Sequence, residues 1–189
     1  MNPQSQPRQS QLRTVLTMIA NPGEVIKNQM IKVPWPYTML ISGLAFTLLF
    51  LQTGIDLFRA GTIGVDRVIL IAIIGLLFGT VGVVLLAMLT YLVVQAGKRD
   101  LTPGGVIANF ALGYTVTLVY SLCGLLFSLA FHWNTAVAFG ITGVLWSLRP
   151  PLFTIKQMSG DATALSVVLT TLCGAIMLFG WGLLGRLGL

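Results

Sequence analysis

Long apolar stretches alternate with short polar gaps along most of this chain, and the charged residues lie almost entirely in the gaps. A helix needs about 20 mainly apolar residues to cross the hydrocarbon core of a bilayer. Four of the stretches reach about that length, and all are continuous, without the alternation of barrel strands. The five stretches are Tyr37–Ile55, Val68–Val94, Val106–Phe131, Thr135–Leu148 and Ala162–Leu184. The pattern predicts an all-α bundle of transmembrane helices.

The fourth stretch is too short to cross a membrane unaided, because 14 residues rise only about 21 Å in a helix. Extending it through Arg149, Pro150 and Pro151 to Ile155 restores the length. We therefore predict five transmembrane helices. If this segment only re-enters the membrane, the C-terminus returns to the side of the N-terminus.

Composition supports a membrane protein and not a soluble one. Charged residues make up 8% of the chain, against about 25% in soluble domains, and mean hydropathy is +0.90. The net charge is +6, but the basic residues are scattered through the gaps and do not form the dense stripe of a nucleic-acid binder. With the N-terminus in the cytoplasm, eight of the 11 basic residues lie inside. The positive-inside rule then places the C-terminus outside.

The first 36 residues precede the apolar stretches. Residues 1–10 are polar and contain proline, so we expect a disordered tail, followed by amphipathic cytoplasmic helices over residues 11–36 and the five-helix domain over residues 37–189. Asn21, Pro22, Gly23 and Glu24 resemble a capping box at a helix start. The following segment carries lysines and an apolar side, which suits a helix on an anionic leaflet or one packed under the bundle.

Small residues recur at helical spacing in three of the stretches. Such faces allow close approach of helices where lipid provides no hydrophobic drive. They predict packing within the chain or a dimer interface. The residues are Gly75, Gly79 and Gly82, then Ala136 and Gly140, then Ser166, Thr170 and Gly174.

Polar residues follow one helical face of the third stretch. The face would bond neighbouring helices or line a path through the bundle. Its residues are Asn109, Gly113, Thr117, Tyr120 and Gly124, extended by Ser121 and Ser128.

Arg149 lies about six residues, or roughly 9 Å, from the end of its extended helix. An ionisable residue at this depth is costly and a functional candidate. It would reach the cytoplasmic interface as an anchor or bind an anionic lipid beside Pro150 and Pro151.

Catalytic and metal-binding patterns are missing from the sequence. His132 is the single histidine, and the five acidic residues lie in different gaps. No spacing is typical of a metal site or of an activated nucleophile. We interpret the chain as a non-enzymatic protein without a cofactor.

Three short motifs together resemble the Yip (Ypt-interacting protein) domain family, from about Leu12 to the C-terminus. They are Asn21-Pro22-Gly23-Glu24, Gly113-Tyr114 and Leu148-Arg149-Pro150-Pro151-Leu152-Phe153. The resemblance implies five spans; eukaryotic members bind prenylated Rab-type GTPases in vesicle traffic. Here Lys32-Val33-Pro34-Trp35-Pro36 stands where that group has an acidic motif, and Leu118 stands where a proline often follows Gly-Tyr. The short tail is similar to compact bacterial members, which implies the bacterial inner membrane.

Two functions follow from these patterns. The first is a scaffold or partner-binding module that contacts membrane lipids and a membrane protein or a second copy. It would use a basic cytoplasmic face made of Lys27, Lys32, Lys98 and Arg99. The alternative is a transporter or channel for a small molecule, ion or lipid, which would use the polar face and Arg149.

Overall fold

The computed structural model describes residues 17, 21, 23, 34–94 and 102–185. These residues contain no strand and include five helical segments long and apolar enough to cross a membrane, so the predicted all-α membrane bundle is confirmed. The spans are α3 (Trp35–Arg59); α4 (Val65–Leu77), the π-helix η1 (Phe78–Gly82) and α5 (Val83–Val94); α6 (Pro103–Gly113) and α7 (Thr115–Phe131); α8 (Ala136–Trp146) and α9 (Arg149–Met158); and α10 (Thr163–Leu184). The predicted disordered tail and most of the predicted amphipathic helices lie outside the described residues.

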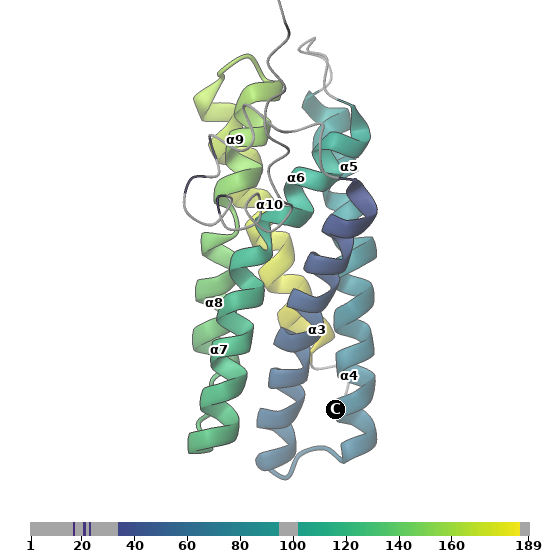
Figure 1. The fold of residues 1–189 in the computed structure, drawn as a ribbon, viewed down its shortest axis with the longest axis vertical. Helices are drawn as coiled ribbons and strands as arrows, with labels where there is room; N and C mark the ends of the chain where they lie inside the picture. Colours follow the sequence, from purple (N-terminus) through teal and green to yellow (C-terminus); the bar gives the residue numbers. More distant parts are fainter. Residues whose placement is uncertain (1–16, 18–20, 22, 24–33, 95–101, 186–189) are drawn as a thin grey trace, which may run out of the picture.

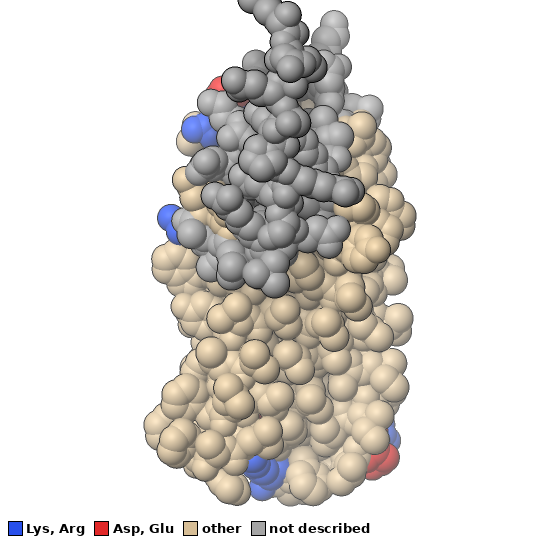
Figure 2. Space-filling view, viewed as in Figure 1, with Lys and Arg blue, Asp and Glu red and all other residues tan. Residues whose placement is uncertain are grey.

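The spans run alternately up and down the bundle (Figure 1). α3 begins in the upper half and α10 ends in the lower half, so the first and last spans begin and finish at opposite ends of the bundle. On the face drawn in Figure 2, a band without Lys, Arg, Asp or Glu among the described residues separates charged atoms in the upper part from those at the lower end. This arrangement is that of a multi-pass membrane protein.

The fourth span continues through the two prolines, as the extended helix requires. α9 follows α8 towards the upper end instead of turning back (Figure 1), and only Ser147 and Leu148 separate them. Pro150 and Pro151 lie in the first turn of α9, where a missing N–H removes no bond within that helix. The re-entrant alternative is not what the structure adopts.

Small residues bring the second span against α3. A Cβ added to Gly75 would lie 2.6 Å from the carbonyl oxygen of Phe46, and one added to Gly79 would lie 2.5 Å from that of Ser42. Both positions therefore pack backbone against backbone within the chain. Gly82 is different, because a Cβ there would meet only the ring of Phe78 in its own span.

Two further glycines have the same use elsewhere in the bundle. A Cβ on Gly140 would lie 2.6 Å from Leu49 and 2.9 Å from Trp181, and one on Gly174 would lie 2.5 Å from Leu148. The small residues were predicted to serve packing within the chain or a dimer interface, and Gly140 and Gly174 pack within the chain.

Two helices extend beyond the predicted apolar stretches. The first stretch was expected to end at Ile55, but α3 continues to Arg59, and Asp56 and Arg59 bond to other helices. The third stretch was expected to begin at Val106, but α6 begins at Pro103. Thr102 caps the first turn of α6 by accepting a hydrogen bond from the amide of Gly105 at 3.2 Å.

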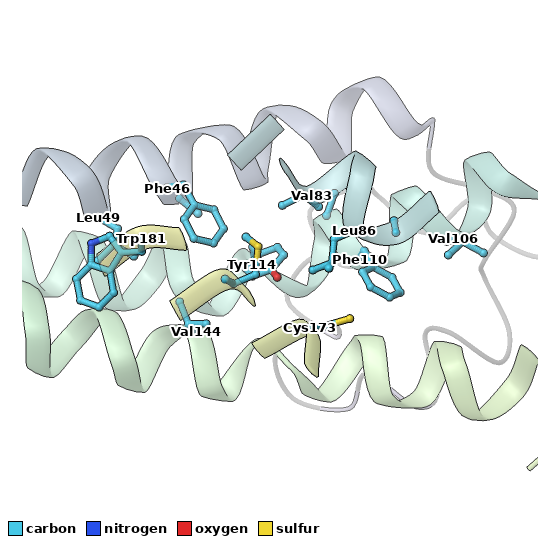
Figure 3. Close-up of a cluster of buried hydrophobic side chains, with 14 of the residues drawn as sticks. Phe46, Leu49, Val83, Leu86, Val106, Phe110, Tyr114, Val144, Cys173 and Trp181 are labelled. Carbon is cyan, nitrogen blue, oxygen red and sulfur yellow. The ribbon is translucent and has the colours of Figure 1, made fainter. Parts of the chain in front are cut away.

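The core lies along the middle of the bundle. Side chains from α3, the second span, α6, α8 and α10 meet there, and Figure 3 shows Tyr114 between Phe46 and Val144. α3 and the third span are the most buried spans, whereas the second span and α10 are the least buried.

Candidate functional site at paired helix breaks

The third span is interrupted at Tyr114. α6 ends at Gly113, α7 begins at Thr115, and Tyr114 lies between them with φ −76° and ψ 4°. We expected one continuous helix, so the predicted polar face is divided between two helices. The break lies against a matching break in the fourth span.

Ser147, in the break of the fourth span, caps α7 from outside its own helix. Tyr114, at the N-cap position, makes no side-chain capping bond. Instead the amide N–H of Thr117 donates to the Ser147 hydroxyl at 3.0 Å, and the two hydroxyl groups lie 2.7 Å apart. The amides of a first helical turn have no partner within the helix. Ser147 thus satisfies one of them inside the bundle.

Gly113 lies directly against the same break. A Cβ at this position would be 3.0 Å from the carbonyl oxygen of Ser147, 3.2 Å from Pro151 Cδ and 3.4 Å from Pro150 Cβ. Pro150 and Pro151 have no N–H, so the carbonyls of Trp146 and Ser147 lose their usual donors within the helix. Glycine allows the two breaks to approach this closely. We call Gly113, Tyr114, Thr117, Ser147, Pro150 and Pro151 the break site.

The N-terminal motif reaches the same region. A Cβ on Gly23 would lie 3.4 Å from Cε1 of Phe153, one turn along α9 from the two prolines. Asn21 is exposed, and its amide donates to the Thr17 carbonyl at 2.7 Å. Pro22 and Glu24 lie outside the described residues. Gly23 and Gly113, from two of the three motifs, thus both lie against the third motif at the start of α9.

Phe46 of α3 links the break site to the π-helix. The centroid of its ring lies 4.9 Å from that of Tyr114, and the two rings meet edge-on (Figure 3). Its centroid also lies 5.3 Å from that of Phe78, the first residue of η1. The irregular segments of the second and third spans therefore share one aromatic neighbour.

The predicted polar face turns mainly into the bundle. Asn109, Thr117, Gly124 and Ser121 are buried, whereas Tyr120 is partly exposed. Several polar atoms of this region have no hydrogen-bond partner in the part of the chain that the structure describes. They are Asn109 Nδ2, Tyr114 Oη, Ser121 Oγ and Thr170 Oγ1.

Arg149 does not join the buried polar face. Its side chain is exposed, and its guanidinium carbon lies 5.0 Å from the centroid of the Trp146 ring. This geometry is a cation–π contact. Among the described residues, the one ion pair is that of Arg67 with Asp66, so Arg149 has no acidic partner there. Its position suits a contact with lipid.

A second polar cluster, not predicted from the sequence, lies where α3 ends and α8 begins. The Gln52 amide donates to Thr135 Oγ1 at 2.7 Å, and the Thr135 hydroxyl donates to the Gly124 carbonyl at 2.9 Å. The spacing of Gln52, Asp56 and Arg59 at i, i+4 and i+7 was the available signal, because it places three polar groups on one helical face.

Asp56 and Arg59 complete this cluster. Asp56 Oδ2 accepts from the Ala136 amide at 3.0 Å, near the start of α8, and Arg59 donates to the Ser128 hydroxyl at 2.7 Å. The cluster therefore joins α3 to α7 and α8. We call Gln52, Asp56, Arg59, Gly124, Ser128 and Thr135 the α3–α8 cluster.

Compared with known proteins, the chain matched no family model, no curated protein and no solved structure. Within the described ranges, no three His, Cys, Asp or Glu side chains gather as metal ligands, and Cys123 and Cys173 are free thiols. The basic residues Lys27, Lys32, Lys98 and Arg99 lie outside those ranges. The break site and the α3–α8 cluster are the two candidate sites that remain.

Proposed function

We propose that this protein is a non-enzymatic membrane scaffold of the Yip-domain type, which binds a partner at the end of the bundle formed by α9. The observation that carries this proposal is the convergence of the motifs. Gly113 packs against Pro150 and Pro151, and Gly23 packs against Phe153. These contacts give the residues that resemble the family a common role in building one surface.

α9 has the composition of a binding surface. It carries Arg149, Lys156 and Gln157 among its exposed or partly exposed side chains, and Phe153 is 39% exposed. Aromatic residues and arginine dominate binding energy at protein interfaces. Lys27, Lys32, Lys98 and Arg99 add positive charge to the same cytoplasmic side under the proposed topology. The partner that fits is a membrane protein with an acidic cytoplasmic segment.

The proposed location is the bacterial inner membrane, with the N-terminus in the cytoplasm and the C-terminus in the periplasm. The distribution of basic residues supports this orientation. A reporter that is active only in the periplasm, fused after Leu189, should be active. Activity of a cytoplasmic reporter at the same position would contradict the orientation.

Site-specific photocrosslinking in cells tests the binding surface. A crosslinking amino acid at Phe153 should capture one membrane protein. The matched control places it at Leu172 of α10, which is 54% exposed, and there it should capture lipid. Reversing the charges of Lys27, Lys32, Lys98 and Arg99 should abolish the protein crosslink, whereas Thr117→Val should retain it. Equal protein crosslinking from both positions would contradict the proposal.

A transporter, channel or lipid-handling protein is the second candidate. Buried polar atoms of Asn109, Tyr114, Ser121 and Thr170 have no hydrogen-bond partner among the described residues, which favours this function, because polar groups inside a membrane often mark substrate paths. Proteoliposomes containing only this protein would then move ions, small solutes or labelled lipid, and Asn109→Leu would stop the movement. A scaffold would show none above the level of empty liposomes.

A further inference from the structure

The turn between α7 and α8 carries four stacked aromatic side chains. The ring of Phe127, in the last turn of α7, is stacked on those of Phe131 and Trp133, whose centroids lie 5.6 Å and 5.8 Å from its own. The ring of Phe139, in the first turn of α8, also stacks on that of Phe127, at 5.8 Å between centroids. The centroids of Phe131 and Trp133 lie 5.5 Å apart. We call these four residues the aromatic cluster.

Most of the aromatic cluster faces outward. Phe127 is 38% exposed, Phe131 59% and Trp133 58%, even though each ring packs against its neighbours. Leu126 of α7 and Val137 of α8 are exposed as well. The rings are therefore continuous with the apolar outer surface of the two helices. In a multi-pass membrane protein such a surface contacts lipid.

Two hydrogen bonds set the height of this turn along the bundle. Arg59 donates to Ser128 at 2.7 Å, in the last turn of α7, and Asp56 accepts from the Ala136 amide at 3.0 Å, at the start of α8. Asp56 and Arg59 are the first charged residues after the apolar stretch of α3. Because charged side chains are costly in the hydrocarbon core, the turn lies level with the edge of that core, where lipid headgroups begin.

The turn between α7 and α8 is polar but carries no Lys, Arg, Asp or Glu. His132, Trp133 and Asn134 are exposed, and residues 102–148 contain none of the four charged residue types. The turn between α3 and α4, at the same end of the bundle (Figure 1), is followed by Asp66 and Arg67. Tryptophan is enriched where headgroups meet acyl chains, since its ring is apolar and its N–H needs a hydrogen-bond partner. This composition fits a lipid surface better than a charged protein partner.

The backbone holds the turn in a defined shape. His132 caps α7 in the left-handed conformation, with φ 59°, and its amide donates to the Ser128 carbonyl at 3.0 Å. On the other side of the turn, the Thr135 hydroxyl donates to the Gly124 carbonyl of α7 at 2.9 Å. Trp133 therefore projects from a turn that is tied to α7 at both ends. A pre-organised side chain loses less conformational entropy when it binds.

We propose that the aromatic cluster is a lipid-binding anchor, in which Phe127, Phe131 and Trp133 insert at the boundary between headgroups and acyl chains. The indole N–H of Trp133 donates to a phosphate or ester oxygen of a phospholipid, and the rings contact the first carbons of the acyl chains. The occupant of this surface is phospholipid of the surrounding bilayer. The anchor fixes the depth of the lower end of the bundle. It lies at the opposite end from α9 (Figure 1), so it is independent of the proposed partner.

Fluorescence quenching by brominated phosphatidylcholine tests the anchor in the full-length protein. The protein is reconstituted in two bilayers, one brominated near the ester end of the acyl chains and the other near their methyl end. The emission of Trp133 is the difference between the wild type and Trp133→Phe, a substitution in an exposed turn. We expect bromine near the ester end to remove more of this emission than bromine near the methyl end.

Trp146 is the matched control, because it is 49% exposed and lies on the helix that follows the turn. α8 has 11 residues, so Trp146 lies about 15 Å from Ala136, or half the thickness of a hydrocarbon core of about 30 Å. Its emission is the difference between the wild type and Trp146→Phe. Bromine near the methyl end should remove more of that emission, which is the opposite order to that of Trp133.

Two results would overturn the proposal. Trp133 emission that neither lipid quenches would show that protein, such as a second copy of the chain, covers the aromatic cluster. Stronger quenching of Trp133 by bromine near the methyl end would show that the turn lies inside the hydrocarbon core. If Trp133→Phe does not fold, Asn134→Trp adds a reporter beside the intact cluster, and the order in which the two lipids quench its added emission decides instead.

Discussion

The backbone amide of Thr117 donates to the side chain of Ser147, 30 residues further along the chain, at a distance of 3.0 Å. Ser147, in the break of the fourth span, thereby caps α7, the helix that begins at the break of the third span. In a membrane, water cannot satisfy a free amide, so a break must find its partner within the protein. The pairing of the two breaks lets both spans be irregular at the same place.

Ser147→Ala should destabilise the protein by about 1–3 kcal/mol, because it leaves the buried Thr117 amide without an acceptor. Thr142→Val, on α8, is the control: its hydroxyl donates only to the Ala138 carbonyl of its own helix. We expect a change there within about 0.5 kcal/mol. Reversible unfolding in mixed detergent micelles measures both variants. Equal effects of the two substitutions would show that the cap has no special role.

Gly113→Ala should cost about 1–3 kcal/mol through overpacking. The new Cβ would lie 3.0 Å from the Ser147 carbonyl oxygen and 3.2 Å from Pro151 Cδ, so the two breaks must move apart. Gly182→Ala is the matched control in α10, where a Cβ meets nothing within 4 Å. That substitution should be neutral or stabilising by up to about 1 kcal/mol. A thermal unfolding series in detergent compares them, and a stable Gly113→Ala protein would argue against tight packing at the break site.

Gly79→Ala should separate α3 from the second span and reduce stability by about 3 kcal/mol. Its Cβ would lie 2.5 Å from the Ser42 carbonyl oxygen, a backbone atom that cannot move alone. Gly82→Ala, three residues later, meets only the Phe78 ring at 3.5 Å and should have little effect. The difference between the two variants in the same unfolding measurement is the test. Similar losses at both positions would mean that helix flexibility and not close approach explains these glycines.

Arg149→Leu should reduce the anionic phospholipid that copurifies with the protein, because its exposed guanidinium group has no acidic partner among the described residues and can bind lipid phosphate. Arg149→Lys keeps the charge but loses the planar fork. The Arg149→Lys protein should retain bound lipid if Arg149 acts only through its charge. It should lose the lipid if binding requires the two parallel hydrogen bonds of a guanidinium group to phosphate. Native mass spectrometry counts the lipids. Unchanged binding in Arg149→Leu would remove Arg149 from any lipid site.

Much of the fold was predictable from single stretches of sequence. Five apolar stretches predicted five spans, and the short length of the fourth predicted that its helix continues through Pro150 and Pro151. The glycines of the second stretch predicted close packing. Each of these inferences needs only the local sequence, because lipid requires every spanning segment to satisfy its own backbone and to present an apolar surface.

The candidate sites depended on contacts that no single stretch contains. The break at Tyr114 was missed because a helix without proline or an obvious cap gives no local signal. The first stretch was expected to end at Ile55 because charged residues usually end a span, whereas here α7 and α8 provide partners for Asp56 and Arg59.

The sequence by itself determined that the chain crosses a membrane with helices, since transfer into lipid depends on the composition of each segment. Only the tertiary structure decided which polar groups are paired and which are left without a donor. Hydrogen bonds between spans, such as those of Thr117 with Ser147 and of Gln52 with Thr135, depend on how the helices pack against each other. That packing places Gly23 and Gly113 against α9 and leaves one oxygen each of Gln52 and Asp56 without a donor among the described residues.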